Sequence, residues 1–160
     1  KVRFELNKFS WSPIIEVAVL FLGIFTTMTP ALAYLNANAA SLGLTDTWQF
    51  YYSTGLLSSF LDNTPTAVAF HSVAAGLTAD QIAAFGGNMM AGIPEILLTA
   101  ICIGAVFFGA MTYIGNGPNF MVKAIAEESG VKMPSFFGYM YKFSLIVLLP
   151  IYILVQLIFL

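Results

Sequence analysis

Three long apolar segments stand out along the chain, at residues 13–35, 93–114 and 136–160. At 1.5 Å per residue, a helix over residues 13–35 would reach about 35 Å, and the hydrocarbon core of a bilayer is about 30 Å thick. The third segment carries no charge beyond Lys142. The pattern therefore predicts three transmembrane helices.

A fourth apolar stretch, residues 48–77, is interrupted in its middle by the polar sequence Asp62-Asn63-Thr64-Pro65-Thr66. As helices, its arms 48–61 and 67–77 would reach only about 21 Å and about 16 Å, so neither arm crosses a bilayer alone. Pro65 lacks a backbone donor and disfavours helix at Thr64. The stretch is either one broken spanning helix or a re-entrant hairpin, which enters and leaves the membrane on the same side.

The basic residues favour the hairpin. A full crossing would split the six Lys and Arg residues evenly between the two sides, whereas a hairpin puts all of them in the cytoplasm, as the positive-inside rule prefers. These residues are Lys1, Arg3, Lys8, Lys123, Lys132 and Lys142. We therefore predict a multi-pass protein of the cell inner (plasma) membrane, with loops 36–47 and 78–92 outside and its C-terminus outside.

A second interruption, Gly115-Asn116-Gly117-Pro118-Asn119, follows the second apolar segment. Glycine, proline and asparagine so close together are unfavourable inside a helix. Residues 120–129 then predict a short amphipathic helix. Backbone that leaves helix at membrane depth must be buried in protein or line a watery cavity, so two such breaks predict a binding site built from broken helices.

These elements predict an all-α integral membrane fold in three parts. Residues 1–47 contain a basic start on the cytoplasmic side and a scaffold transmembrane helix. Residues 48–92 contain the re-entrant helical hairpin, with its DNTPT tip, and an external loop. Residues 93–160 contain a transmembrane helix broken at GNGPN, the short amphipathic helix and a final transmembrane helix.

Composition supports a membrane protein and excludes several functions. Apolar residues make up 59% of the chain and charged residues 9%, against about 25% charged residues in soluble domains. A chain this hydrophobic is not disordered, and with only 6 Lys and Arg residues it does not bind nucleic acid. One cysteine, Cys102, and one histidine, His71, form no catalytic or metal-binding motif. We therefore predict neither an enzyme nor a bound cofactor.

The two breaks contain hard oxygen donors. Those at the hairpin tip are Asp62, Asn63, Thr64 and Thr66, and those at the second break are Asn116 and Asn119. Such a set, with one formal negative charge, suits Na⁺ or a proton better than a soft transition metal.

Asp62 is the clearest candidate for an ion or proton site, because an ionisable residue at membrane depth is a functional candidate by default. The alternative is that Asp62 only caps the helix that follows, which Asn63 or Thr64 could also do. His71 is a second candidate proton site, with a packing role as its alternative.

Two motifs resemble the second repeat of the ArsB/NhaD ion-transporter superfamily, namely SSFLDNTP at residues 58–65 and YIGNGPN at residues 113–119. Its members include sodium/proton antiporters, arsenite and citrate permeases and, more distantly, divalent-anion/sodium symporters. The likeness is greatest to sodium/proton antiporter or citrate-transporter sequences and covers most of residues 13–160.

The resemblance assigns roles to the residues of both breaks. It implies that Asn63 and Thr64 belong to a sodium-binding hairpin tip, and that an unwound loop faces this tip. The residues that match this loop are Gly115, Asn116, Gly117 and Asn119. Asp62 matches an acid of the antiporter-type sequences, whereas the divalent-anion symporters typically have serine at this place.

The resemblance also implies an architecture and partners. Family members have two inverted repeats, each with a hairpin and a broken helix, and move a transport domain against a dimeric scaffold. Only one hairpin and one broken helix occur here, so we expect half of an inverted-repeat ion transporter, with the missing N-terminal repeat in the same polypeptide. The expected partners are the lipid bilayer, a second copy in a homodimer, and the transported ions or carboxylate.

Three functions remain open at this point. The first is sodium/proton antiport, favoured by Asp62 and by the lack of Lys or Arg at membrane depth between Lys8 and Lys123. The second is a sodium-coupled citrate or dicarboxylate transporter, in which asparagines and helix N-termini hold the carboxylates. The third is a membrane subunit that transports nothing.

Overall fold

The computed structural model describes residues 11–160, so the predicted basic start with Lys1, Arg3 and Lys8 lies outside the described residues. The chain is mostly helical. Its elements are α1 (Ser12–Ala37), the 3-10 turn η2 (Ala39–Leu42), α2 (Thr47–Ser58), α3 (Asn63–Ala75), α4 (Ala79–Phe85), strands β1 (Met89–Met90) and β2 (Ile93–Pro94), α5 (Glu95–Phe108), α6 (Gly117–Glu128), α7 (Phe136–Tyr139), the π-helix η3 (Met140–Leu148) and α8 (Leu149–Phe159).

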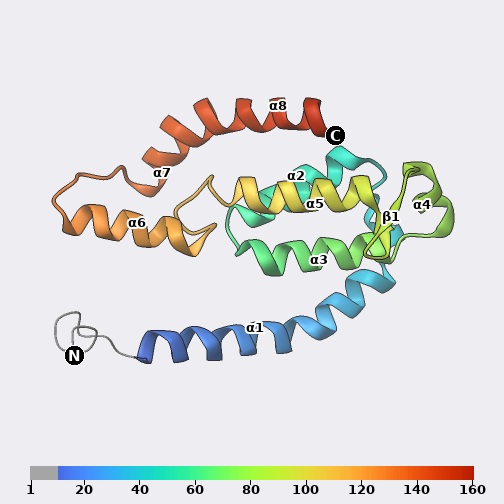
Figure 1. The fold of residues 1–160 in the computed structure, drawn as a ribbon, viewed down its shortest axis with the longest axis horizontal. Helices are drawn as coiled ribbons and strands as arrows, with labels where there is room; N and C mark the ends of the chain where they lie inside the picture. The colour runs from blue at the N-terminus through green and yellow to red at the C-terminus, as the bar shows by residue number, and fades with distance from the viewer. Residues whose placement is uncertain (1–10) are drawn as a thin grey trace.

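The helices run along one common direction (Figure 1). Helices α2 and α3 form a helical hairpin joined at residues 59–62, and α5 packs against both. Helix α1 covers the side of α3, and the continuous helix made of α7, η3 and α8 lies on the opposite side of the molecule. The hairpin tip and the end of α5 therefore both fall in the middle of the molecule.

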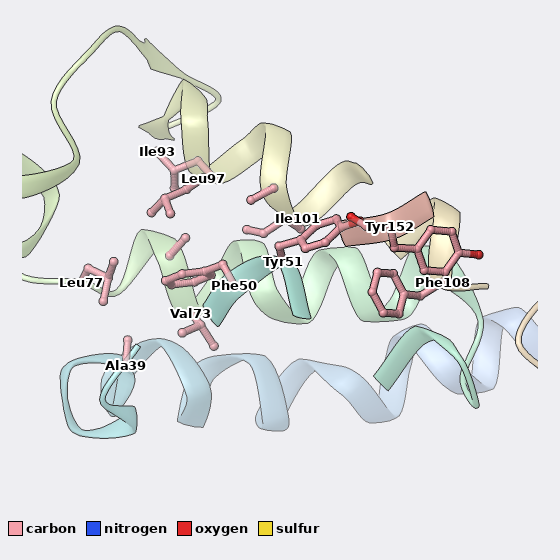
Figure 2. Packing of buried hydrophobic residues seen from close by; sticks show 12 residues of the cluster. Ala39, Phe50, Tyr51, Val73, Leu77, Ile93, Leu97, Ile101, Phe108 and Tyr152 are labelled. Carbon is pink, nitrogen blue, oxygen red and sulfur yellow. The ribbon is translucent and has the colours of Figure 1, made fainter. Parts of the chain in front are cut away.

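Aliphatic and aromatic side chains together fill the core between these helices (Figure 2). Phe50 and Tyr51 from α2 are fully buried, and the Tyr51 ring meets Phe108 of α5 edge-on, with 5.3 Å between the ring centroids. The Phe108 ring lies 4.5 Å from that of Tyr152 in α8. The hydroxyl of Tyr152 donates a hydrogen bond of 2.5 Å to the Phe107 carbonyl. This core fixes the position of the C-terminal end of α5.

Glycines let α2 and α5 approach closely. A Cβ atom at Gly104 of α5 would lie 2.6 Å from the Tyr51 carbonyl oxygen of α2, and one at Gly55 would lie 2.5 Å from the Phe108 ring. Small residues at such crossings are typical of helix pairs in membranes. In contrast, a Cβ atom at Gly23 in α1 would meet nothing within 4 Å.

We expect Gly104→Ala to lower stability by about 1–3 kcal/mol, because the new methyl group forces the backbones of two core helices apart. Gly23→Ala is the matched control and should leave stability unchanged or slightly raised, since alanine favours helix. Thermal unfolding of both variants in detergent checks this. Equal melting temperatures would contradict the close packing of α2 on α5.

The predicted first and third apolar segments are helical. Helix α1 has Pro30 inside it and bends in its second half, as expected where a proline removes a helical hydrogen bond (Figure 1). Within residues 11–160, one helix is long and apolar enough to cross a membrane, the continuous helix Phe136–Phe159. The position of α1 across a bilayer stays a prediction.

The second predicted helix is shorter than expected. The apolar pattern predicted a helix to Ile114, but α5 ends at Phe108, and the 14 residues of α5 reach only about 21 Å. Two carbonyls in the last turn of α5, those of Ala105 and Phe107, accept hydrogen bonds from the hydroxyls of Ser58 and Tyr152 on other helices. Sequence periodicity does not reveal such tertiary partners.

Two other helix boundaries differ from the prediction. Helix α6 begins at Gly117 and not at residue 120, so Gly117, Pro118 and Asn119 form its first turn. Helix α3 begins at Asn63, with Pro65 as its third residue. Proline is tolerated there because first-turn amides have no partner within the helix.

Candidate functional site

The hairpin tip and the non-helical segment after α5 are joined by the side chain of Thr112. This side chain is buried, and its hydroxyl donates to the carbonyl of Ser59 at the tip. The same oxygen accepts hydrogen bonds from the backbone amides of Ile114 at 3.2 Å and Gly115 at 3.0 Å. One threonine therefore holds the tip against residues 109–116, which we call the break.

Asn63, the first residue of α3, makes a second connection. Its amide nitrogen is assigned toward acceptors, because the opposite orientation would aim its oxygen at them. The nitrogen then has three acceptors within hydrogen-bond distance, which share its two hydrogens: the carbonyls of Ala105 at 2.9 Å and Gly115 at 3.2 Å, and the hydroxyl of Ser58 at 2.9 Å. The Asn63 oxygen accepts from the side-chain amide of Asn116 at 3.3 Å. Asn63 thus links the tip to both sides of the break.

Glycine is required where these segments touch. A Cβ atom at Gly115 would lie 2.7 Å from the Ser59 carbonyl oxygen, and one at Gly109 would collide with the side-chain amide of Asn63. A Cβ atom at Gly117 would meet nothing within 4 Å. Of the two glycines that the sequence singled out, only Gly115 is needed for close contact.

Asn119 in the first turn of α6 stabilises the break by hydrogen bonds. Its amide nitrogen donates to the carbonyl of Gly109 at 3.0 Å and to that of Thr112 at 3.4 Å. An asparagine amide has two donor hydrogens and one acceptor oxygen. The bonds to Gly109 and Thr112 use the donors, so the Asn119 oxygen is the group left to meet a ligand.

Helix ends of both polarities converge at this place. Asn63 begins α3 and touches Asn116, the residue that precedes α6, while the hydroxyl of Ser58, at the end of α2, donates to the carbonyl of Ala105 in the last turn of α5 at 2.6 Å. Helix N-termini carry partial positive charge and C-termini partial negative charge. The arrangement is suited to hold an anion against two N-termini and a cation near two C-termini.

Asp62 lies on the other side of the tip. It occupies the N-cap position of α3, yet its carboxylate makes no capping hydrogen bond, so capping does not account for this acid. Asp62 lines a pocket of about 310 Å³ between the hairpin tip and α1. The other lining residues are apolar except for one threonine: Ile24, Met28, Leu57, Leu61, Pro65, Thr66 and Ala69.

Two further predicted residues are not brought into these contacts. Thr64 is exposed, and its hydroxyl has no hydrogen bond among residues 11–160. His71 lies nine residues beyond Asp62, or about 14 Å along α3, and its Nε2 is 3.0 Å from the carbonyl oxygen of Ala91 in the turn between β1 and β2. The structure therefore does not bring His71 to Asp62.

Thr112, Ser58 and Gly109 were missed by sequence reasoning. Thr112 lies in a stretch that the apolar pattern assigned to a helix. Its hydroxyl bonds to amides two and three residues ahead, a local turn that threonine often forms. A threonine next to a glycine-rich break was the available signal. No sequence signal reveals the contacts of Ser58 and Gly109, because they depend on how α2, α3 and α5 pack.

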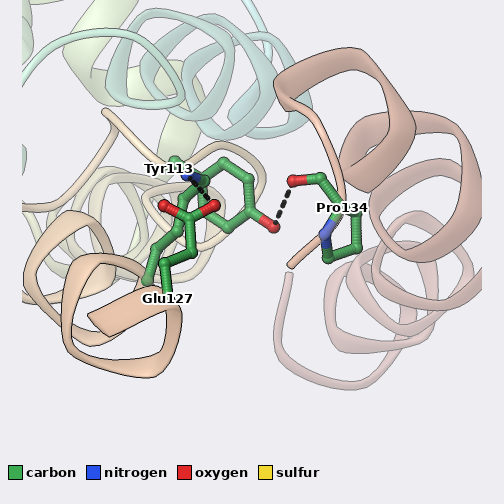
Figure 3. A network of polar contacts seen from close by, with 4 residues as sticks. Tyr113, Glu127 and Pro134 are labelled. Carbon is green, nitrogen blue, oxygen red and sulfur yellow. Dashed lines mark hydrogen bonds and ion pairs between the residues drawn. The ribbon is translucent and has the colours of Figure 1, made fainter. Parts of the chain in front are cut away.

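A polar network holds the chain on the side of the break that leads to α6 and α7 (Figure 3). The hydroxyl of Tyr113 donates to the carbonyl of Pro134 at 3.2 Å. Lys123 and Glu127 form an ion pair of 2.7 Å on α6, and the Lys123 ammonium lies 5.5 Å from the centre of the Tyr113 ring. The charge of Lys123 is thus already matched by a carboxylate.

Comparison with known proteins gives a match to one family over the whole chain. The family whose model matches residues 1–160 is described as "Putative citrate transport". No curated protein and no solved structure matches the chain.

Proposed function

Because the chain belongs to this citrate-transport family, which is part of the ion transporter superfamily, we propose that it transports citrate or a similar small carboxylate together with a cation. It is a membrane transporter and not an enzyme. The alternative from the sequence, sodium/proton antiport, is further from the family description than carboxylate transport.

The observation that carries this proposal is the meeting of two helix N-termini at Asn63 and Asn116. Backbone amides in the first turn of a helix have no partner within the helix, so those of Asn63, Thr64 and Gly117 are suited to bind carboxylate oxygens. No Lys or Arg lies between Lys8 and Lys123 to pair with an anion, and these backbone amides can take that role. The carboxylate would bind between the tip and the break.

A cation would bind close by, at oxygen atoms. The side-chain oxygens of Asn116 and Asn119, together with the carbonyl ends of α2 and α5, are hard donors of the kind that Na⁺ prefers. Half-helix ends arranged in this way hold substrate and coupling ion in secondary transporters. We therefore assign Na⁺ to the role of coupling ion.

Under this proposal, α2 and α3 form a re-entrant hairpin, and α5 and α6 are the two halves of one broken transmembrane helix. The short lengths of α2, α3 and α5 support this interpretation, since none of them spans about 30 Å of hydrocarbon alone. The basic residues then lie in the cytoplasm, as the positive-inside rule requires.

Uptake of radiolabelled citrate into proteoliposomes tests the proposal. An inward Na⁺ gradient should drive accumulation, whereas a K⁺ gradient of the same size should not. Dissipation of a pH gradient by Na⁺ without any citrate uptake would instead establish sodium/proton antiport. If the protein neither takes up citrate nor lets Na⁺ dissipate the pH gradient, the proposal of a transporter for either substrate is overturned.

We assign a second coupling cation or proton to the carboxylate of Asp62, separate from the Na⁺ at Asn116 and Asn119. We therefore expect Asp62→Asn to abolish this second coupling while leaving carboxylate binding within about twofold. The reason is geometric, because Asp62 lines the pocket toward α1, on the side of the tip away from Asn116. Parallel measurements of citrate exchange at equilibrium and of gradient-driven uptake separate the two effects. Loss of both would show that the carboxylate of Asp62 belongs to the substrate site.

Asp80→Asn is the control for Asp62→Asn. Asp80 is an exposed acid in the first turn of α4, outside the tip and the break. Its neutralisation removes the same charge and should leave exchange and driven uptake unchanged.

A further inference from the structure

The last long helix donates hydrogen bonds to the break from two of its hydroxyl groups. The hydroxyl of Tyr139 donates to the carbonyl of Ala110 at 3.0 Å. The hydroxyl of Ser144 donates to the carbonyl of Met111 at 2.6 Å, and Ser144 is fully buried. Both carbonyls lie beyond the end of α5, where no helical amide is available to them. The last helix therefore supplies hydrogen bonds that the break lacks.

These two hydroxyls share one face of the helix because the helix is locally π-helical. The residues Met140–Leu148 form a π-helix, at whose end the amide of Leu149 bonds to the carbonyl of Ser144, five residues back. On a regular α-helix, residues five apart point about 140° away from each other. Hydrogen bonding at five-residue intervals brings Tyr139 and Ser144 toward the same side. π-Helical segments are rare and are found mostly at functional sites.

The two carbonyls directly precede Thr112, the residue that joins the tip to the break. A shift of Ala110 or Met111 would carry the Thr112 hydroxyl with it, together with its bonds to Ser59 and Gly115. Buried carbonyls without a partner are costly, and more so in a membrane, where water does not replace the lost donor. The position of Thr112 thus depends on the last helix.

We propose that the π-helical segment sets the register of the last helix so that Tyr139 and Ser144 act as positioning residues for the carboxylate site. They do not touch the substrate. They hold the backbone of Ala110 and Met111, so that Thr112 keeps the break against the hairpin tip. This inference rests on the proposed function of the tip and the break.

The test uses three variants of the full-length protein: Ser144→Ala, Tyr139→Phe and Tyr141→Phe. Tyr141 is the control, because it lies on the same helix, is exposed and makes no hydrogen bond through its side chain among residues 11–160. We expect Ser144→Ala and Tyr139→Phe each to raise the KM for citrate uptake about tenfold, the factor that one buried hydrogen bond supplies. The maximal rate per folded molecule should change less than about twofold.

A purely structural role predicts a different result. It would lower the yield of folded protein and the maximal rate, with KM unchanged, and that outcome would overturn the inference. An equal rise in KM for Tyr141→Phe would overturn it too, because the effect would not depend on the two hydroxyls.

Hydrogen exchange separates this inference from the proposed function. Amides of residues 110–116 should exchange about tenfold faster in Ser144→Ala and Tyr139→Phe than in Tyr141→Phe, whatever the substrate is. If wild-type protein takes up no citrate while exchange follows this pattern, the proposed substrate is wrong and the positioning role stands. Unchanged exchange in all three variants would overturn the positioning role.

Discussion

Asn63→Asp should reduce citrate uptake by about 100-fold or more. Aspartate has the same shape as asparagine but is acceptor-only when ionised. It would therefore face the carbonyls of Ala105 and Gly115 with an oxygen where the native amide donates to both of them. A buried group that loses its partner costs about 1–3 kcal/mol, and more where a charge is involved, so the lost bond to Gly115 and the repulsion between the carboxylate and both carbonyls account for this factor. The tip should then separate from the break.

The measurement is citrate uptake in proteoliposomes, normalised to the amount of monodisperse protein. Asn88→Asp is the matched control, since Asn88 is exposed in the loop before β1 and adds the same charge on substitution. Wild-type uptake by Asn63→Asp would contradict the assignment of Asn63 as the link between tip and break.

Gly115→Ala should abolish uptake, whereas Gly117→Ala should retain it. The Cβ atom of an alanine at position 115 would lie 2.7 to 2.9 Å from the carbonyl oxygens of Ser59, Gly109 and Ser58. Backbone atoms cannot turn aside as a side chain can, so the tip and the break must separate to make room. At position 117 the added methyl group has open space around it.

The two glycine variants distinguish a requirement for close packing at Gly115 from a requirement for the GNGPN motif as a whole. Both glycines belong to the same five-residue motif, so a requirement for the motif as such would make the two alanine variants equally inactive. Initial rates of citrate uptake for the two purified variants, compared at equal protein, measure the difference. Equal activity of the two variants would contradict the close contact of Gly115 with the tip.

The two polar interruptions indicated the candidate site, because polar and helix-breaking residues are unfavourable inside apolar membrane segments unless protein or a ligand surrounds them. Asn63, Asn116 and Asn119 were predicted from these interruptions and Gly115 from the family resemblance, and the structure brings them together. The end of α5 could not be predicted, since residues 109–114 carry no charge and no proline and continue the apolar stretch of the helix before them. Their conformation depends on hydrogen bonds from Tyr139 and Ser144, which lie far away in the sequence, while Ser58 of α2 bonds to the Ala105 carbonyl just before them.

The directions in which the side chains of the hairpin tip point could not be predicted from the sequence either. Asp62 and Asn63 are neighbours in one motif, yet Asn63 contacts the break while Asp62 lines the pocket beside α1. Adjacent residues at a helix start point in different directions, and packing decides which of them meets the site. His71, on the same helix, lies too far along α3 to act with Asp62.

Protection of an introduced cysteine by substrate tests most directly that the carboxylate binds between the tip and the break. The protein for this test carries Cys102→Ser, because the native thiol is exposed, together with Thr64→Cys at the exposed side of the tip. Met90→Cys in strand β1, also exposed, serves as the reference position. At about ten times its KM and in the presence of Na⁺, citrate should slow the reaction of the thiol at position 64 with a water-soluble thiol reagent about tenfold, because the free site is then about tenfold less populated. The reaction at position 90 should keep its rate. Equal rates at position 64 with and without citrate, in protein that still transports citrate, would contradict a substrate site between the hairpin tip and the break.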